Sequence, residues 1–262
     1  MKKITNLIIA TLCIMSCTNE SVTQPEDQSC DNGTFVGIVI LKSQQEVDEF
    51  GAMCYSKIDG ALQIGALSGM TDDITDLSPL SSIKEVFTSD EDNASGEGRF
   101  IIKSSNLLSL NGLRLERLAT LEIYKTSLRN LNGLESLVEI SNYGDYNHLI
   151  ISENPMLENL NGLNNLVKIG TDGQYTTIDI RWNPMLENLD GLSGLIHIEG
   201  NLAASTYGCP DGGIVCGNNS LVNFCGLTNL VATGFNVEYG DIFQGNAYNP
   251  TVQDIINGNC SQ

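Results

Sequence analysis

The apolar positions of this chain follow a recurring phrase, Leu-x-x-Leu-[Asn/Asp]-Gly-Leu, in which a polar step interrupts a run of leucines. The phrase widens to ten residues in two places, where Asn-Pro-Met-Leu-Glu-Asn-Leu-Asn-Gly-Leu at 154–163 returns at 183–192 with Asp for the third Asn. Copies start at residues 74, 107, 128, 157, 186 and 221, and the first and last are degenerate. Repeats of this length predict stacked structural units.

Short segments with period-2 alternation follow the repeats, at 100–102, 121–123, 149–151 and 178–180. Such segments are too short to be stable alone, so we expect them to stack as a parallel sheet with the leucines inside. The Asn-Gly or Asp-Gly step suits a tight corner. Asn154 and Asn183 occupy equivalent places in successive units. They either hydrogen-bond the corner backbone in a stack or serve only as turn formers.

The region before the repeats predicts a strand, a helix and a second strand. Residues 35–41 are rich in β-branched side chains, and residues 58–67 resume an extended pattern. Between them, Ser43 followed by Glu46 is a capping box, and Val47, Phe50 and Met53 form the apolar stripe of a short helix. We expect this unit to cover one open end of the stack, and the aromatic segment 235–260 to cover the other.

These features resemble the receptor L-domain family, a leucine-rich-repeat-like β-solenoid. The resemblance rests on the opening unit at 39–65 and on the Leu-x-x-Leu-[Asn/Asp]-Gly-Leu units, and it covers about residues 35–231. It implies a mainly β, right-handed parallel β-solenoid with a short N-terminal capping helix. It also implies a domain that binds partners and does no catalysis, although no family ligand residue maps onto this chain.

The N-terminus is typical of an exported lipoprotein. Lys2 and Lys3 precede an apolar stretch of about nine residues, which is too short to span a membrane as a mature helix. The sequence Ile-Met-Ser-Cys at 14–17 resembles a lipobox, with Met15 in place of the usual small residue. We expect residues 1–16 to be a lipoprotein signal peptide and Cys17 to carry lipid at an outer membrane. Residues 17–30 would form a polar tether, and residues 31–262 one domain.

Six cysteines remain after the signal and the lipobox, which is an even number suited to three disulfides in an exported chain. Sequence proximity favours the pairs Cys30–Cys54, Cys209–Cys216 and Cys225–Cys260. Zinc binding is the competing interpretation, but the chain has no Cys-x-x-Cys and neither histidine lies near a cysteine in the sequence.

Composition and motifs narrow the chemistry further. The chain holds 32 acidic and 13 basic residues, a net charge of −19 that disfavours nucleic acid as a partner. Hydrolase, metalloprotease and P-loop motifs are absent from the sequence. The acidic segment 90–93 departs from a calcium loop, because Ser95 replaces the turn glycine and Ile101 the bidentate glutamate. We therefore expect no metal, no cofactor and no enzyme activity; His197 is expected to be a solvated surface residue.

Two surfaces are candidates for binding. Insertions enter the repeat at one point and would project tyrosines from one edge of the stack. The loop candidates are Tyr143, Tyr146, Tyr175 and Tyr207. The outward strand positions form a second face. The sheet-face candidates are Tyr124, Arg181 and Trp182, with Ile101, Lys103, Glu122, Ile150, Ser152 and Asp179 around them.

Each surface also has an interpretation without binding. The loop tyrosines would each pack under their own loop, and the sheet face would be an ordinary exposed sheet. We expect a cell-surface binding module for a protein or a glycan, held to the membrane by its lipid. The alternative function is a structural or assembly component of the envelope.

Overall fold

The computed structural model describes residues 30–66, 72–89, 98–141, 146–172, 175–199, 201–202, 214–233 and 242–262. The segments between these ranges, and residues 1–29, are left undescribed. The expectations for the signal peptide, for Cys17 and the tether, and for the acidic segment 90–93 therefore lie outside the described residues.

The described chain is mainly β, with short strands separated by turns and three short α-helices. The strands are β1 Thr34–Leu41, β2 Lys57–Ile64, β3 Glu85–Phe87, β4 Arg99–Ile102, β5 Arg117–Leu118, β6 Thr120–Tyr124, β7 Glu139–Ile140, β8 Tyr146–Ser152, β9 Lys168–Ile169, β10 Tyr175–Arg181, β11 His197–Ile198, β12 Asn201–Leu202, β13 Val215–Cys216 and β14 Phe243–Gln244. The helices are α1 Gln44–Gly51, α2 Thr228–Ala232 and α3 Val252–Ile256, and the 3-10 turns are η1 Ser78–Leu80, η2 Asp190–Leu192 and η4 Cys225–Leu227.

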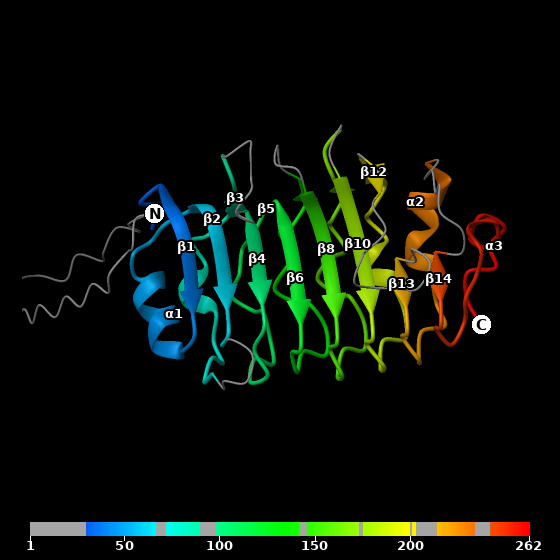
Figure 1. Ribbon diagram of the computed structural model, residues 1–262, viewed down its shortest axis with the longest axis horizontal. Helices are drawn as coiled ribbons and strands as arrows, with labels where there is room; N and C mark the ends of the chain where they lie inside the picture. Colours follow the sequence, from blue (N-terminus) through cyan, green and yellow to red (C-terminus); the bar gives the residue numbers. More distant parts are fainter. Residues whose placement is uncertain are drawn as a thin grey trace, which may run out of the picture.

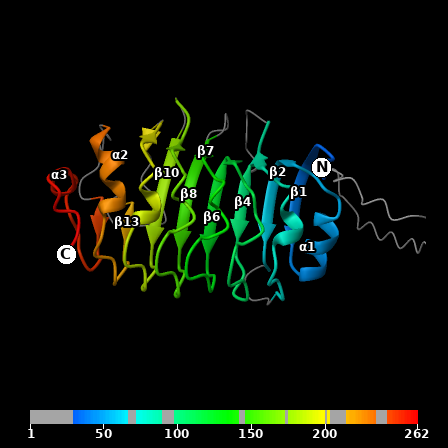
Figure 2. The same cartoon turned by 180° about the vertical axis from the view of Figure 1, so that it is seen from behind.

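All of these strands belong to one sheet of 14 strands, and the pairings between them are parallel. Two paths of strands diverge from β2. One path runs β4, β6, β8, β10, β13 and β14, and the other runs β3, β5, β7, β9 and β11. Figure 1 shows the longer strands of the first path side by side along the molecule, and Figure 2 shows the molecule from behind, with β7 of the second path labelled. The predicted strands at 100–102, 121–123, 149–151 and 178–180 all lie in the first path.

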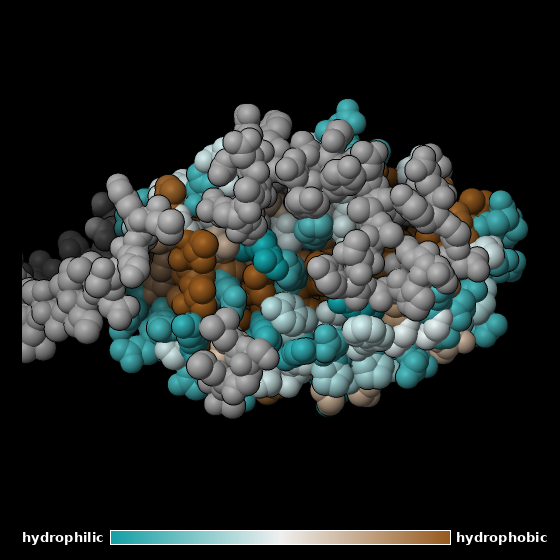
Figure 3. Space-filling view, viewed as in Figure 1, coloured by the Kyte–Doolittle hydropathy of each residue, from teal (hydrophilic) through white to brown (hydrophobic). Residues whose placement is uncertain are grey.

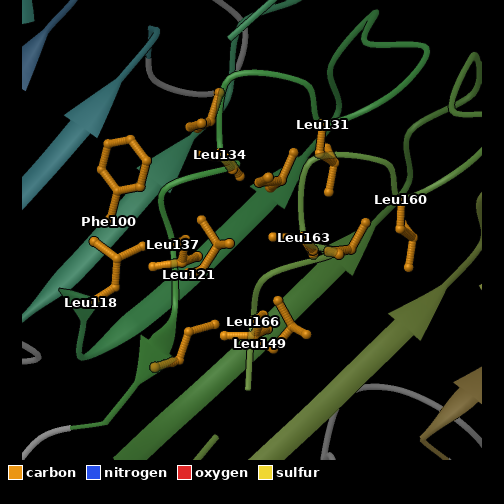
Figure 4. Close-up of a cluster of buried hydrophobic side chains, with 14 of the residues drawn as sticks. Phe100, Leu118, Leu121, Leu131, Leu134, Leu137, Leu149, Leu160, Leu163 and Leu166 are labelled. Carbon is orange, nitrogen blue, oxygen red and sulfur yellow. The ribbon is translucent and has the colours of Figure 1, made fainter. Parts of the chain in front are cut away.

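The leucines of the repeat fill the space between the two paths. Leu110, Leu131, Leu160 and Leu189 take the same place in successive coils, and each has no exposed surface. Figure 4 shows Leu131, Leu134 and Leu137 of one coil beside Leu160, Leu163 and Leu166 of the next, within one cluster of buried side chains. Burying a leucine side chain contributes about 1.5–3 kcal/mol. One continuous apolar cluster results, from Val39 in β1 to Ile255 in α3.

The recurring corner of the repeat depends on close contact between coils. In the Asn-Gly step, Gly162 has φ +112°, and a Cβ added there would meet the carbonyl oxygen of Leu131 at 2.0 Å. The equivalent Gly191 has no positive φ, yet a Cβ there would meet Leu160 O at the same distance. Glycine at these corners therefore lets the backbones of neighbouring coils come close together. At some corners, glycine is also needed because the backbone is left-handed.

The predicted opening unit is present, with one difference in its helix. The Ser43 side chain accepts a hydrogen bond from the Glu46 amide, and Glu46 Oε2 accepts one from the Lys42 amide at 2.5 Å, one residue before the position that a capping box uses. Val47 and Phe50 are buried, but Met53 lies beyond the end of α1 and is 48% exposed. The stripe was therefore predicted one turn too long, because the helix stops at Gly51.

Disulfides close both ends of the stack. Cys30 is bonded to Cys54 beside β1, and Cys225 is bonded to Cys260 beside α3, which confirms two predicted pairs. Cys216 is also disulfide-bonded. Its predicted partner Cys209 lies outside the described residues. At the C-terminal end, the ring of Phe224 packs on Phe243, with 4.9 Å between centroids.

Candidate binding surface on the outward sheet face

Alternation along β4, β6, β8 and β10 brings the predicted sheet-face residues into rows. Ile101, Glu122, Ile150 and Asp179 are register partners across the four strands. One step toward the carboxyl ends, Tyr124, Ser152 and Arg181 are partners on β6, β8 and β10. The sequence therefore placed these residues on one face correctly.

This face has a buried part and an accessible part, which the sequence did not predict. Ile101, Glu122, Ser152 and Asp179 are buried, with exposed fractions of 7% or less. Arg181 is also largely enclosed, since only 11% of its side chain is exposed. The expectation of an open sheet face is therefore wrong for its central row. A residue can point outward from a sheet and still be covered in the folded chain.

The accessible part is a row at the carboxyl ends of the strands, which we call the carboxyl row: Lys103, Tyr124 and Trp182. Lys103 and Tyr124 are half-buried, and Trp182 is 48% exposed. Lys103 Nζ lies 5.2 Å from the centroid of the Tyr124 ring, and the Arg181 guanidinium carbon lies 4.9 Å from that of Trp182. Both contacts are within the range of cation–π attraction, so each aromatic ring is held by a neighbouring cation.

Ion pairs make this face nearly neutral, although the chain carries −19. Arg99 Nε and Nη2 each donate to a Glu122 oxygen at 2.7 Å. Arg181 pairs with Asp179, and Lys125 pairs with Glu153 at 3.3 Å. Lys103 is the cation of the carboxyl row, and its Nζ lies near the Tyr124 ring. A ligand at this row therefore meets aromatic rings and little net negative charge.

The pKa shifts follow from the same burial. Hydrogen bonds to Glu122 raise the pKa of Arg99 against the opposing effect of burial. Burial, with the Glu122 charge, raises the pKa of Tyr124. Burial also lowers the pKa of His148, which lies two residues before Ile150 on β8. Arg99 therefore supplies a fixed positive charge and Tyr124 a hydroxyl donor.

A ladder of buried side chains fixes the backbone beneath the carboxyl row. The side-chain oxygen of Asn183 accepts bonds from the backbone amide and the side-chain amide of Asn154 at 3.0 and 3.1 Å. Asn183 in turn donates to Asn218, and Asn218 donates to Asn246. Thr126 begins the series by donating to Asn154 from its amide and its hydroxyl. The interpretation of Asn154 and Asn183 as a hydrogen-bonded stack is therefore confirmed.

The ladder also accounts for an unusual backbone at the carboxyl row. The residue before each rung is left-handed, with φ of 57° at Lys125, 58° at Glu153 and 54° at Trp182. Side chains other than glycine rarely adopt this conformation, so the buried rungs must hold it in place. The indole of Trp182 also lies against Gly217, where an added Cβ would meet Cδ1 at 2.5 Å.

The sequence analysis missed Thr126, Asn218 and Asn246 as members of the ladder. A signal for one of them was present, because Asn218 precedes the start of a repeat by three residues, as Asn154 and Asn183 do. Thr126 and Asn246 carry no such signal. Their equivalence appears only once the strands are in register.

The loop tyrosines are described only in part. Tyr146 and Tyr175 begin β8 and β10 and are register partners. They therefore belong to strands, and the prediction that they lie in loop insertions is wrong. Nothing is described of their side chains. Tyr143 and Tyr207 lie outside the described residues.

The remaining polar rows are structural in character. On the second path, Arg117, Glu139 and Lys168 align in register, and His197 extends the row with an exposed side chain, as expected. Arg117 contacts Glu139 at 2.6 Å and Lys168 contacts Glu199 at 2.8 Å. Among the described residues, no group of three or more His, Cys, Asp or Glu side chains is arranged to hold a metal ion.

The described helices are also too short or too polar to cross a membrane. Comparison of the chain with protein-family models, with curated proteins and with solved structures found no match in any of the three.

Proposed function

We propose that this chain is an exported, lipid-anchored binding module of the receptor L-domain type. In this proposal residues 31–262 form one right-handed β-solenoid, with α1 as its N-terminal cap and the lipid on Cys17 as its membrane anchor. The parallel sheet, the leucine core and the end disulfides support it. Disulfides are typical of chains that fold outside the reducing cytosol.

The carboxyl row is the surface that we propose for binding, and one observation carries the proposal. Tyr124 is aligned through Ser152 with Arg181, two strands or about 9.6 Å across the sheet, and Trp182 follows Arg181 on a backbone held by buried asparagines. Rigid aromatic side chains give contact area at low entropic cost, and they are enriched in protein interfaces. The near-neutral surroundings allow a protein segment or a glycan to approach a chain of high negative charge.

Binding screens on the purified protein test this function. A glycan array and a pull-down from envelope extract are each run with wild type, Tyr124→Ala and Trp182→Ala. Each substitution should weaken the captured interaction by about 1–3 kcal/mol. The matched control is Leu108→Ala, which removes a 73% exposed apolar side chain in another part of the coil. Equal binding by the Tyr124, Trp182 and Leu108 variants would exclude the carboxyl row.

The same screens separate the binding module from the alternative function. A stoichiometric partner from the same envelope would favour a structural or assembly role, and capture of a foreign glycan or protein would favour recognition. The anchor has its own test. A fatty-acid analogue should label the wild-type chain and should not label Cys17→Ala, and labelling of that variant would overturn the lipoprotein proposal.

A further inference from the structure

Strand β1 carries an apolar stripe that the described part of the chain leaves exposed. Val36, Ile38 and Ile40 are 75%, 59% and 39% exposed, whereas the alternate residues Val39 and Leu41 are buried. We call these three residues the β1 stripe. Figure 3 shows an apolar patch on the sheet face at the end of the molecule where Figure 1 places β1. Contiguous exposed apolar surface of this kind marks interaction sites in soluble proteins.

The backbone of β1 is open along the same residues. Within the described part of the chain, β1 pairs with β2 alone, in unbroken register from Thr34 to Leu41. The carbonyl oxygens of Gly33 and Leu41 accept bonds from the β2 side, from the amides of Lys57 and Gly65. Because successive residues of a strand direct their amide and carbonyl groups to opposite sides, the even-numbered residues face away from β2.

The strand lacks the usual protection of a sheet edge. Natural edges are guarded by charged side chains, proline or a bulge, since an open edge is a template for another strand. The sequence of β1, Thr-Phe-Val-Gly-Ile-Val-Ile-Leu, contains no charge and no proline. Its eight residues give both the hydrogen-bonding edge and the apolar side chains that strand addition requires.

The charges around β1 favour a basic partner. Exposed carboxylates lie just beyond both ends of β1, at Asp31 before it and at Glu46 and Glu49 in α1, against one exposed cation, Lys42. The chain as a whole carries −19, so two copies repel one another. A positively charged partner is attracted by this negative charge.

We propose that β1 binds an extended segment of another protein by strand addition. The segment is apolar at every second residue, which covers the β1 stripe, and carries Lys or Arg at its ends, which meet the flanking carboxylates. This surface lies at the opposite side of the outward sheet from Trp182 and does not depend on the proposed function of the carboxyl row.

A peptide of alternating Val and Thr with two Lys at each end is the probe, labelled with a fluorophore and titrated against the full chain. Saturable binding is expected by fluorescence anisotropy, and it should weaken with salt. A peptide of the same composition with its valines grouped, and one with Glu in place of Lys, should bind at least ten times more weakly. Equal binding of all three peptides, or no saturable binding of the first, would overturn the proposal.

Two variants distinguish strand addition from a general apolar patch. Val36→Pro removes an amide that faces away from β2, so it should reduce binding about tenfold or more while the β1–β2 pairing persists. Ile38→Thr keeps strand propensity and shortens the stripe, and it should also weaken binding. Leu108→Thr, an exposed apolar position elsewhere, should leave binding unchanged. Circular dichroism checks that each variant folds.

The second-copy alternative has a separate readout. Analytical ultracentrifugation of the wild type without peptide should show a monomer over the concentration range of the titration. A concentration-dependent dimer that Val36→Pro or Ile38→Thr abolishes would assign β1 to self-association and refute the proposed partner. If Ile38→Thr and Leu108→Thr have equal effects on peptide binding, β1 is not the site.

Discussion

Replacing Asn183 by alanine should destabilise the protein far more than any exposed asparagine substitution. The Asn183 side chain is fully buried and makes four hydrogen bonds. Its oxygen accepts from the backbone amide and the side-chain amide of Asn154, at 3.0 and 3.1 Å. Its nitrogen donates to Ile151 O at 3.0 Å and to Asn218 Oδ1 at 3.2 Å. Alanine removes all four bonds and leaves no room for bulk water.

The magnitude follows from what each partner loses. The buried backbone amide of Asn154 loses its acceptor, which costs about 1–3 kcal/mol. The other three bonds contribute roughly 0.5–1.5 kcal/mol each. Two of the partners keep a second bond: the Asn154 side-chain amide still donates to Ile123 O, and Asn218 Oδ1 still accepts from the Asn183 backbone amide. The sum is about 2.5–7.5 kcal/mol, which is a large part of the 5–15 kcal/mol that stabilises a typical domain.

Urea denaturation followed by circular dichroism measures the overall loss of stability. Hydrogen exchange read by peptide mass spectrometry then locates it, because the Asn154 amide should exchange faster when its acceptor is gone. Asn132→Ala is the matched control, since Asn132 is exposed at a corner of the coil, and its effect should stay within about 0.5 kcal/mol. If Asn183→Ala and Asn132→Ala cost the same, the ladder does not stabilise the stack as argued.

Three further changes test other parts of the fold. Gly162→Ala should cost roughly 2–4 kcal/mol, because its Cβ would meet Leu131 O, whereas Gly258→Ala, at φ +84° with nothing within 4 Å, should cost about 1 kcal/mol by the same urea assay. Cys225→Ser should lower the free energy of unfolding by about 2–4 kcal/mol, and an unchanged value would contradict the role of that disulfide. Burial lowers the folded-state pKa of His148, so its stabilising effect is complete above the unfolded pKa of about 6.5 and is lost as the pH falls through the folded value. His148→Asn should therefore lose less stability than wild type between about pH 7 and pH 5, and equal losses would refute this account.

The sequence by itself determined the repeating architecture. Leucine spacing and period-2 segments identified β4, β6, β8 and β10 of the first path and the residues of the core, because a stacked unit must bury the same positions in every copy. The short strands β13 and β14 were not identified. The sequence also identified Ser43 as a helix cap and two of the disulfides, since these depend on local chemistry and short separations in the chain.

Only the tertiary structure decided which outward residues are accessible. Alternation places Glu122 and Tyr124 on the same face, but the first is buried and the second half-exposed, since burial depends on what the rest of the chain brings over the strand. The same holds for the ladder, where Thr126 and Asn246 join Asn154 through register between coils and not through any shared motif. Periodicity reports which side of a strand a residue faces, and long-range packing alone decides what that side meets.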